Sequence, residues 1–146
     1  MKTQDGRLYV VAGASRSDKT AWVRKNVKAR RVFAWDPEDQ WAQLKGWVKV
    51  TTRAQLLTLA KKKGAQKVAF VTGGKLAEEF DFFCACATYA GRYVEPLDVI
   101  AEELADVSTP SKAPNAWGIL VRRGLKRGIS IYAISQRWSE ADKTAF

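Results

Sequence analysis

The chain has 146 residues, a length that suits one domain with a substantial buried core. Its composition, 47% hydrophobic and 27% charged, is ordinary for a folded protein. No apolar run reaches the length of a membrane span, and the first residues lack the apolar core of a secretory signal. We therefore expect a single domain over residues 1–146, with no membrane span and a cytoplasmic location.

The sequence is strongly basic, with 25 lysines and arginines against 15 acidic residues and a net charge of +10. This excess favours a polyanionic partner, because phosphate contacts release counterions. Composition does not separate DNA from RNA, and a basic protein that binds no nucleic acid is the alternative.

The only cysteines, Cys84 and Cys86, lie in an apolar stretch at a spacing that places them poorly for bonding to each other. The chain has no histidine to complete a zinc site. We predict two buried thiols.

Short apolar runs alternate with helix-like segments along the chain, which predicts an α/β fold with a largely parallel sheet. The predicted strands are 8–12, 31–35, 67–71, 97–101 and 129–135, with 47–50 as a further edge strand. The predicted helices are 20–29, 52–63, 75–90 and 115–127. A loop at 105–115, rich in Ser, Pro and Lys, follows a strand end, where function is commonly built in this class of fold.

The loop after the first strand has the spacing of a P-loop, or Walker A motif, with Asp18 in place of its second glycine. In such a loop, backbone N–H groups surround the β-phosphate, a lysine reaches the β and γ oxygens, and a hydroxyl contacts Mg²⁺. These features predict a nucleotide site formed by Gly13, Ala14, Ser15, Arg16, Ser17, Asp18, Lys19 and Thr20. The alternative is a surface turn in which the aspartate caps the next helix.

The run LDVIAEEL, residues 97–104, is an apolar strand that ends in two carboxylates. In P-loop NTPases with an inserted strand, the first acid at this place holds the Mg²⁺ water shell and the second polarises the attacking water. Glu102 and Glu103 fit these Walker B roles. Asp98 is unusual in mid-strand, so we expect this strand to lie near a sheet edge or to start later. A strand followed by a solvated acidic helix start is the alternative.

A basic segment leads into the last strand, which ends at Ser135 and Gln136. An amide at the tip of a strand beside the nucleotide strand can hydrogen-bond the γ-phosphate or the attacking water. Gln136 is therefore the predicted sensor of the bound nucleotide.

These motifs, in this order, resemble those of the HerA/FtsK superfamily of P-loop DNA motors, and within it the small genome-packaging ATPases of viruses such as tectiviruses. The likeness spans nearly the whole chain. It rests on G-x-x-x-x-x-K-T, on "WDP" at 35–37, on "IAEEL" at 100–104, on "RRGLKRGI" at 122–129 and on "ISQRWSEADK" at 134–143.

The resemblance implies a three-layer P-loop NTPase of the RecA/ASCE type that uses ATP and Mg²⁺. It assigns phosphate and Mg²⁺ contacts to Lys19, Thr20 and Glu102, and the general base to Glu103. It also implies an arginine inserted into a neighbour's site, for which the candidates are Arg122, Arg123 and Arg127. Without the surrounding motifs, these arginines would be read as a solvated helix.

The same resemblance implies a homo-oligomeric ring, a hexamer if the family habit holds, which moves double-stranded DNA without regard to sequence. Viral capsid or portal proteins are expected partners, and the location is the host cytoplasm or the virion. Candidate pore residues are Lys61, Lys62 and Lys63 or Lys112, although a lysine triplet is more often a solvated helix end. Most of the six tryptophans are expected in the core or at subunit contacts.

Two features depart from the family pattern: Asp18 in the P-loop and the end of the chain at Phe146, where relatives usually continue into a further strand and helix. A shortened version of the fold is therefore expected. The rival reading is a degenerate P-loop protein that serves as a basic nucleic-acid-binding or assembly module. A small-molecule kinase fits less well, because no arginine-rich lid is found.

Overall fold

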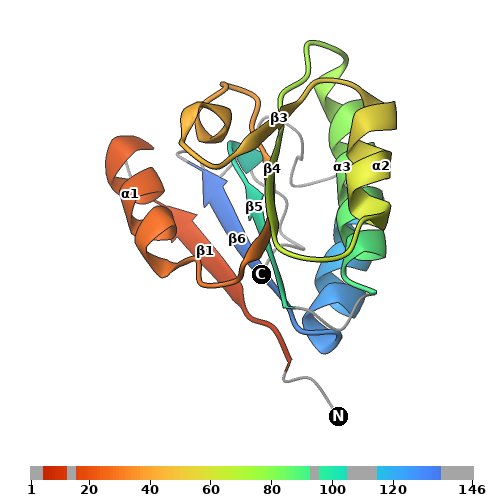
Figure 1. Cartoon of the computed structure of the whole chain (residues 1–146). Helices are drawn as coiled ribbons and strands as arrows, with labels where there is room; N and C mark the ends of the chain where they lie inside the picture. The colour runs from red at the N-terminus through yellow and green to blue at the C-terminus, as the bar shows by residue number, and fades with distance from the viewer. Residues whose placement is uncertain (1–4, 13–15, 93–95, 105–114, 136–146) are drawn as a thin grey trace.

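A computed structural model describes residues 5–12, 16–92, 96–104 and 115–135, and within it six strands form one parallel sheet (Figure 1). The strand order is β1-β6-β5-β2-β4-β3. The strands are β1 (Leu8–Ala12), β2 (Arg31–Trp35), β3 (Val48–Val50), β4 (Gln66–Phe70), β5 (Leu97–Ala101) and β6 (Ile129–Ser135). Because all strands run the same way, their starts share one edge, here called the amino edge, and their ends share the carboxyl edge.

Helices cover both faces of the sheet and make three layers (Figure 1). On one face lies α1 (Arg16–Asn26). On the other face, α3 (Leu76–Ala90) packs between α2 (Arg53–Lys61) and the last helical segment, which joins α4 (Asn115–Ile119) to the π-helical η3 (Leu120–Gly124). A short 3-10 turn, η1 (Trp41–Gln43), lies between β2 and β3. This α/β architecture is the predicted fold class.

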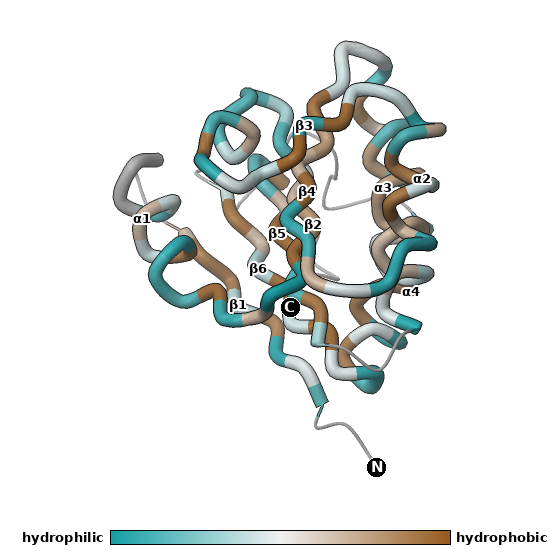
Figure 2. The backbone as a smooth tube through the Cα atoms, in the orientation of Figure 1, coloured by the Kyte–Doolittle hydropathy of each residue, from teal (hydrophilic) through white to brown (hydrophobic). Residues whose placement is uncertain are grey.

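Each face of the sheet has its own hydrophobic core, because side chains of a strand point alternately to the two faces. Along β2, Val32 and Ala34 belong to the core under α1, whereas Phe33 and Trp35 belong to the larger core under α2 and α3. Figure 2 shows much of the central sheet in the brown of hydrophobic residues, between the two layers of helices. The central strands β2 and β5 are therefore buried on both faces.

Both cysteine thiols are free and buried in the larger core, as predicted. Burial raises the pKa of Cys86 to about 11 and the pKa of Cys84 well above its usual value. Trp35, Trp41 and Trp117 are also core residues, whereas Trp22 is 43% exposed on α1. None of the described helices is long and apolar enough to cross a bilayer.

Most predicted boundaries are close to those of the structure. Strand β4 begins at Gln66, one residue earlier than predicted, because Gln66 lies in register with Arg31 of β2. Helix α1 begins at Arg16, earlier than the predicted residue 20, and therefore includes part of the Walker A motif. The π-helical turns over Leu120–Gly124 were not predicted.

The expectation for Asp98 was wrong. Strand β5 starts at Leu97 as drawn from the sequence and lies in the middle of the sheet, between β6 and β2. Asp98 is 7% exposed, and its carboxylate accepts hydrogen bonds from the backbone N–H groups of Lys28 (3.2 Å) and Ala29 (3.1 Å). Burial raises the pKa of Asp98, and these two hydrogen bonds oppose that rise. The acid is accommodated because it binds the loop that follows α1.

A second buried ionisable residue, Arg31, opens strand β2 and is 1% exposed. Its guanidinium donates to the carbonyl oxygens of Lys62 (2.5 Å), Gly64 (3.2 Å) and Ala60 (3.2 Å). These carbonyls belong to the end of α2 and the turn after it, where an α-helix leaves acceptors without partners inside the helix. Arg31 therefore joins the end of α2 to the start of β2.

Candidate nucleotide site

The predicted site residues that the structure describes gather at the carboxyl edge of the sheet. Lys19 and Thr20 lie in the first turns of α1, after β1, and Glu102 and Glu103 follow the end of β5. Strand β6 lies between β1 and β5, with Ser135 in register with Ala12. Strand β6 therefore adjoins β1, the strand that precedes the predicted P-loop, as predicted.

The contact that joins the two halves of the site is between Thr20 and Glu102. The Thr20 hydroxyl donates to Glu102 Oε2 over 3.4 Å, although 82 residues separate the two along the chain. Lys19 is 4% exposed and Glu102 is 3% exposed. The hydroxyl of the predicted Walker A motif and the first acid of the predicted Walker B motif thus meet at one partly buried location, which is where Mg²⁺ chemistry would need them.

A further residue, Trp41, bonds Glu102, and Asp36 holds the turn that carries Trp41; the sequence motifs assigned neither residue a role in the site. The indole Nε1–H of Trp41 donates to Glu102 Oε2 over 2.8 Å. The turn that carries Trp41 is held by Asp36, whose carboxylate accepts from the backbone N–H groups of Gln40 (2.8 Å) and Ala42 (2.9 Å). Asp36 follows the end of β2, so the "WDP" stretch positions the indole beside the acid. The only sequence signal was an aspartate directly after a buried strand.

Burial raises the pKa of Glu102, and the nearby charges of Glu103 and Asp36 raise it further, while the hydrogen bonds from Trp41 and Thr20 lower it. Burial also raises the pKa of Asp36. Several carboxylates packed at one strand end repel one another, and a bound cation would relieve that repulsion.

Mg²⁺, the metal that the resemblance implies, fits this location. Glu102 Oε1 is buried and has no hydrogen-bond partner among the described residues. Within the same residues, no group of three or more His, Cys, Asp or Glu side chains could hold a metal ion by itself. Mg²⁺ commonly binds one or two carboxylates and takes its remaining ligands from phosphates and water. Thr20 and Glu102 are the residues that would hold it.

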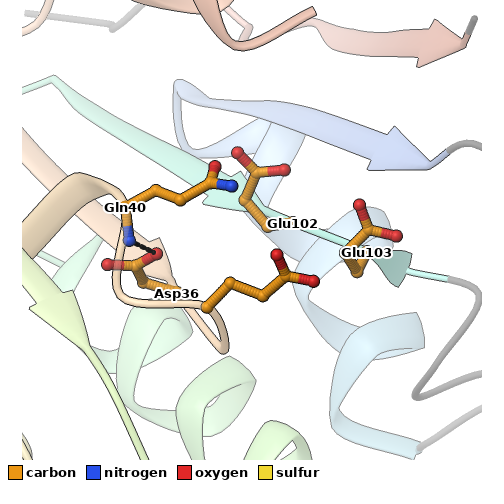
Figure 3. Close-up of a pocket in the computed structure, with 5 residues that line it drawn as sticks. Asp36, Gln40, Glu102 and Glu103 are labelled. Carbon is orange, nitrogen blue, oxygen red and sulfur yellow. Dashed lines mark hydrogen bonds between the residues drawn. The ribbon is translucent and has the colours of Figure 1, made fainter. Parts of the chain in front are cut away.

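Glu103 has an unusual backbone conformation, with φ at +49°, and is 7% exposed. A non-glycine residue in this region costs about 1–3 kcal/mol and is often found at functional sites. Glu103 also lines a small pocket with Asp36, Glu38, Gln40 and Glu102. Figure 3 shows the Gln40 side chain extending from the loop after β2 toward Glu102 at the end of β5, while the Asp36 carboxylate points to the backbone N–H of Gln40.

The candidate arginines do not join this site within one chain. Arg122 and Arg123 lie in η3, and Arg127 comes two residues before the start of β6, at the amino edge. All three are exposed. The other predicted positions fall where the structure gives no account: Gly13, Ala14, Ser15, Gln136 and Lys112 lie outside the described residues, as do the side chains of Arg16, Ser17 and Asp18.

Solved structures of a viral protein share this arrangement of strands and helices. The genome packaging NTPase B204 from Sulfolobus turreted icosahedral virus 2, in complex with ATP-gammaS, matches 97% of this chain and 70% of its own, with a TM-score of 0.72 and 14% identity. The fold is that of a P-loop NTPase. The same protein with AMPPCP gives a TM-score of 0.71 at 13% identity, covering 97% of this chain and 69% of its own.

A sequence relative also comes from a virus. Protein P9 of Pseudoalteromonas phage PM2 is 35% identical over 139 residues, which are 93% of this chain. The chain spans 62% of the length of that relative. No family model matches the sequence.

Proposed function

We propose that this protein is a P-loop ATPase of the HerA/FtsK type that drives the packaging of a viral genome by moving double-stranded DNA. The observation that carries the proposal is the partly buried contact between Thr20 and Glu102, because it unites the predicted Walker A hydroxyl with the first predicted Walker B acid. The fold shared with B204 and the likeness to a phage protein support it. In this proposal, residues 1–146 form one P-loop NTPase domain.

Each site residue has a defined task in ATP hydrolysis. Lys19 and the backbone of residues 13–18 bind the phosphates, and Thr20 and Glu102 hold Mg²⁺. When bound, Mg²⁺ neutralises charge that develops on the phosphate oxygens. Glu103 accepts a proton from the attacking water, and Gln136 hydrogen-bonds the γ-phosphate or that water.

The position of the arginines favours hydrolysis between neighbouring copies. Strand β6 has seven residues and separates Arg127, at the amino edge, from the carboxyl edge, a distance of roughly 20 Å at the usual rise per residue. In this proposal, an arginine at the amino edge reaches the nucleotide site of the next copy in a ring. The ring is a hexamer, as the resemblance to the HerA/FtsK superfamily implies. Arg122, Arg123 and Arg127 all remain candidates for this trans contact.

ATP hydrolysis with Mg²⁺, measured with and without double-stranded DNA at low salt, tests the proposal. We expect turnover that DNA stimulates and that Lys19→Ala abolishes, since the variant loses the ammonium group that contacts the phosphates. Lys25→Ala is the matched control, because Lys25 lies exposed in the last turn of the same helix. Folded wild-type protein that shows no turnover at any concentration would contradict the proposal.

One sequence feature favours a second candidate function, a degenerate P-loop protein that binds nucleic acid without turnover. Asp18 occupies a position where glycine normally lets the backbone approach the phosphates. An acid there repels phosphate if its side chain faces the nucleotide. DNA binding by folded protein that neither binds nor hydrolyses ATP would support this alternative.

Trp41→Phe is expected to weaken Mg²⁺-dependent ATP binding by about tenfold or more, because a hydrogen bond to a charged group contributes roughly 1.5–3 kcal/mol. Phenylalanine keeps a ring in the core but loses the N–H that holds Glu102. ATP affinity measured by calorimetry with and without Mg²⁺ checks this. Trp47→Phe is the control, because the two ring centroids lie 5.4 Å apart and the same change is made beside Trp41. Equal losses in the two variants would indicate a packing effect only.

A further inference from the structure

Acidic residues are absent from two long stretches of the sequence, 19–35 and 40–77. Each stretch contributes a basic loop at the amino edge of the sheet. The first loop precedes β2 and the second precedes β4. Together they present six exposed cationic residues, here called the basic face: Lys28, Arg30, Lys61, Lys62, Lys63 and Lys67.

The two loops of the basic face lie side by side. Strands β2 and β4 are neighbours in the sheet, with Arg31 in register with Gln66 and Val32 in register with Lys67. The backbone N–H of Gln66 also donates to the carbonyl of Arg30 over 3.1 Å. The lysines after α2 and the cations before β2 therefore form one surface, at the opposite edge of the sheet from Glu102 and Glu103.

Buried ionisable residues hold both loops of the basic face from beneath. Asp98 accepts from the backbone of Lys28 and Ala29, and Arg31 donates to three carbonyls of the segment that carries the lysine triplet. Neither Asp98 nor Arg31 belongs to the nucleotide site. Their hydrogen bonds fix the backbone from which the cationic side chains extend, so the loops lose little backbone freedom when the surface binds a rigid partner.

We propose that the basic face binds the phosphate backbone of duplex DNA, an inference that rests on the proposed function. Clustered lysines and arginines bind phosphates electrostatically and without sequence preference. The DNA surface and the nucleotide site then lie at opposite ends of the same strands, and β2 joins them directly, from Arg30 before its start to Asp36 after its end.

The test is DNA affinity as a function of salt, measured by fluorescence anisotropy with labelled duplexes of two unrelated sequences. We expect the double variant Lys62→Gln, Lys67→Gln to bind both sequences more weakly and to reduce the slope of log K against log salt by about two. The control, Lys45→Gln with Lys75→Gln, makes the same change in net charge at exposed positions away from the basic face and should keep the wild-type slope. Arg30→Gln with Lys28→Gln tests the neighbouring loop in the same way.

Equal losses in the basic-face and control variants would overturn the inference, because binding would follow net charge alone. The inference would also be overturned if the wild-type protein bound duplex RNA more tightly than duplex DNA. It would be overturned as well if the wild-type protein bound an acidic protein surface and no DNA. ATP turnover without DNA, measured on the same samples, keeps the two proposals separate. Turnover that DNA stimulates in the basic-face variants as strongly as in the wild type defeats this inference alone, whereas DNA binding through the basic face without turnover defeats only the proposed ATPase.

Discussion

Glu103→Gln is expected to lower ATP turnover by about 10²- to 10⁴-fold, the usual contribution of general base catalysis, while ATP affinity stays close to that of the wild type. Glutamine keeps the size of the side chain but does not accept a proton from water. Glu103 lines the pocket between the ends of β5 and β2. The residue that contacts Thr20 is Glu102, so the variant leaves that contact in place. Single-turnover hydrolysis and ATP binding by calorimetry separate the two effects.

The matched control for this variant is Glu38→Gln. Glu38 lines the same pocket, and its substitution removes the same negative charge from the same end of the sheet. We expect Glu38→Gln to retain most of the turnover, because Glu38 is an exposed residue on the loop after β2. If both variants lost turnover to the same degree, the charge of the pocket, and not the basicity of Glu103, would be responsible.

Arg31→Met should lower the free energy of unfolding by roughly 1–3 kcal/mol, the cost of a buried acceptor left without a partner. Methionine fills a similar volume but donates no hydrogen bond, so the buried carbonyl of Ala60 and the partly buried carbonyl of Gly64 lose the guanidinium donor. The Lys62 carbonyl, by contrast, still accepts from the Gln66 side-chain amide over 3.3 Å. Chemical denaturation followed by tryptophan fluorescence measures the change.

The adjacent residue supplies the control for this prediction. Arg30 is exposed and belongs to the same loop, and surface substitutions of this kind usually change stability by less than about 0.5 kcal/mol. Arg30→Met should therefore unfold at nearly the same denaturant concentration as the wild type. The proposed anchoring by Arg31 would be wrong if the two methionine variants lost equal stability.

The sequence predicts the strands well because a sheet buried on both faces requires short, continuous apolar runs. Strand β2, for example, is buried along its whole length and lies where the run RVFAW predicts it. The error at Asp98 has a clear origin, since its hydrogen-bond partners lie 69 and 70 residues away along the chain. No local pattern reveals a partner at such a distance.

The gathering of the candidate site residues at one edge was predictable from the sequence. The motifs pointed to Lys19, Thr20, Glu102 and Glu103, and parallel strands bring their ends to one edge. Trp41 was expected only as a core or subunit contact, because its hydrogen bond to Glu102 spans 61 residues and depends on a 3-10 turn without periodicity. The roles of all the candidate site residues, Gln136 and the arginines included, stay predictions.

The pairing of β1 has a consequence for synthesis of the chain. Among the described strands, β1 pairs with β6 alone, and Leu8 is in register with Ile131. At the usual rates of translation, the ribosome needs about 6–25 s to make the segment between them. During that interval the N-terminal strand has no partner in the sheet. Strand β1 therefore takes its place in the sheet only after β6 has emerged from the ribosome.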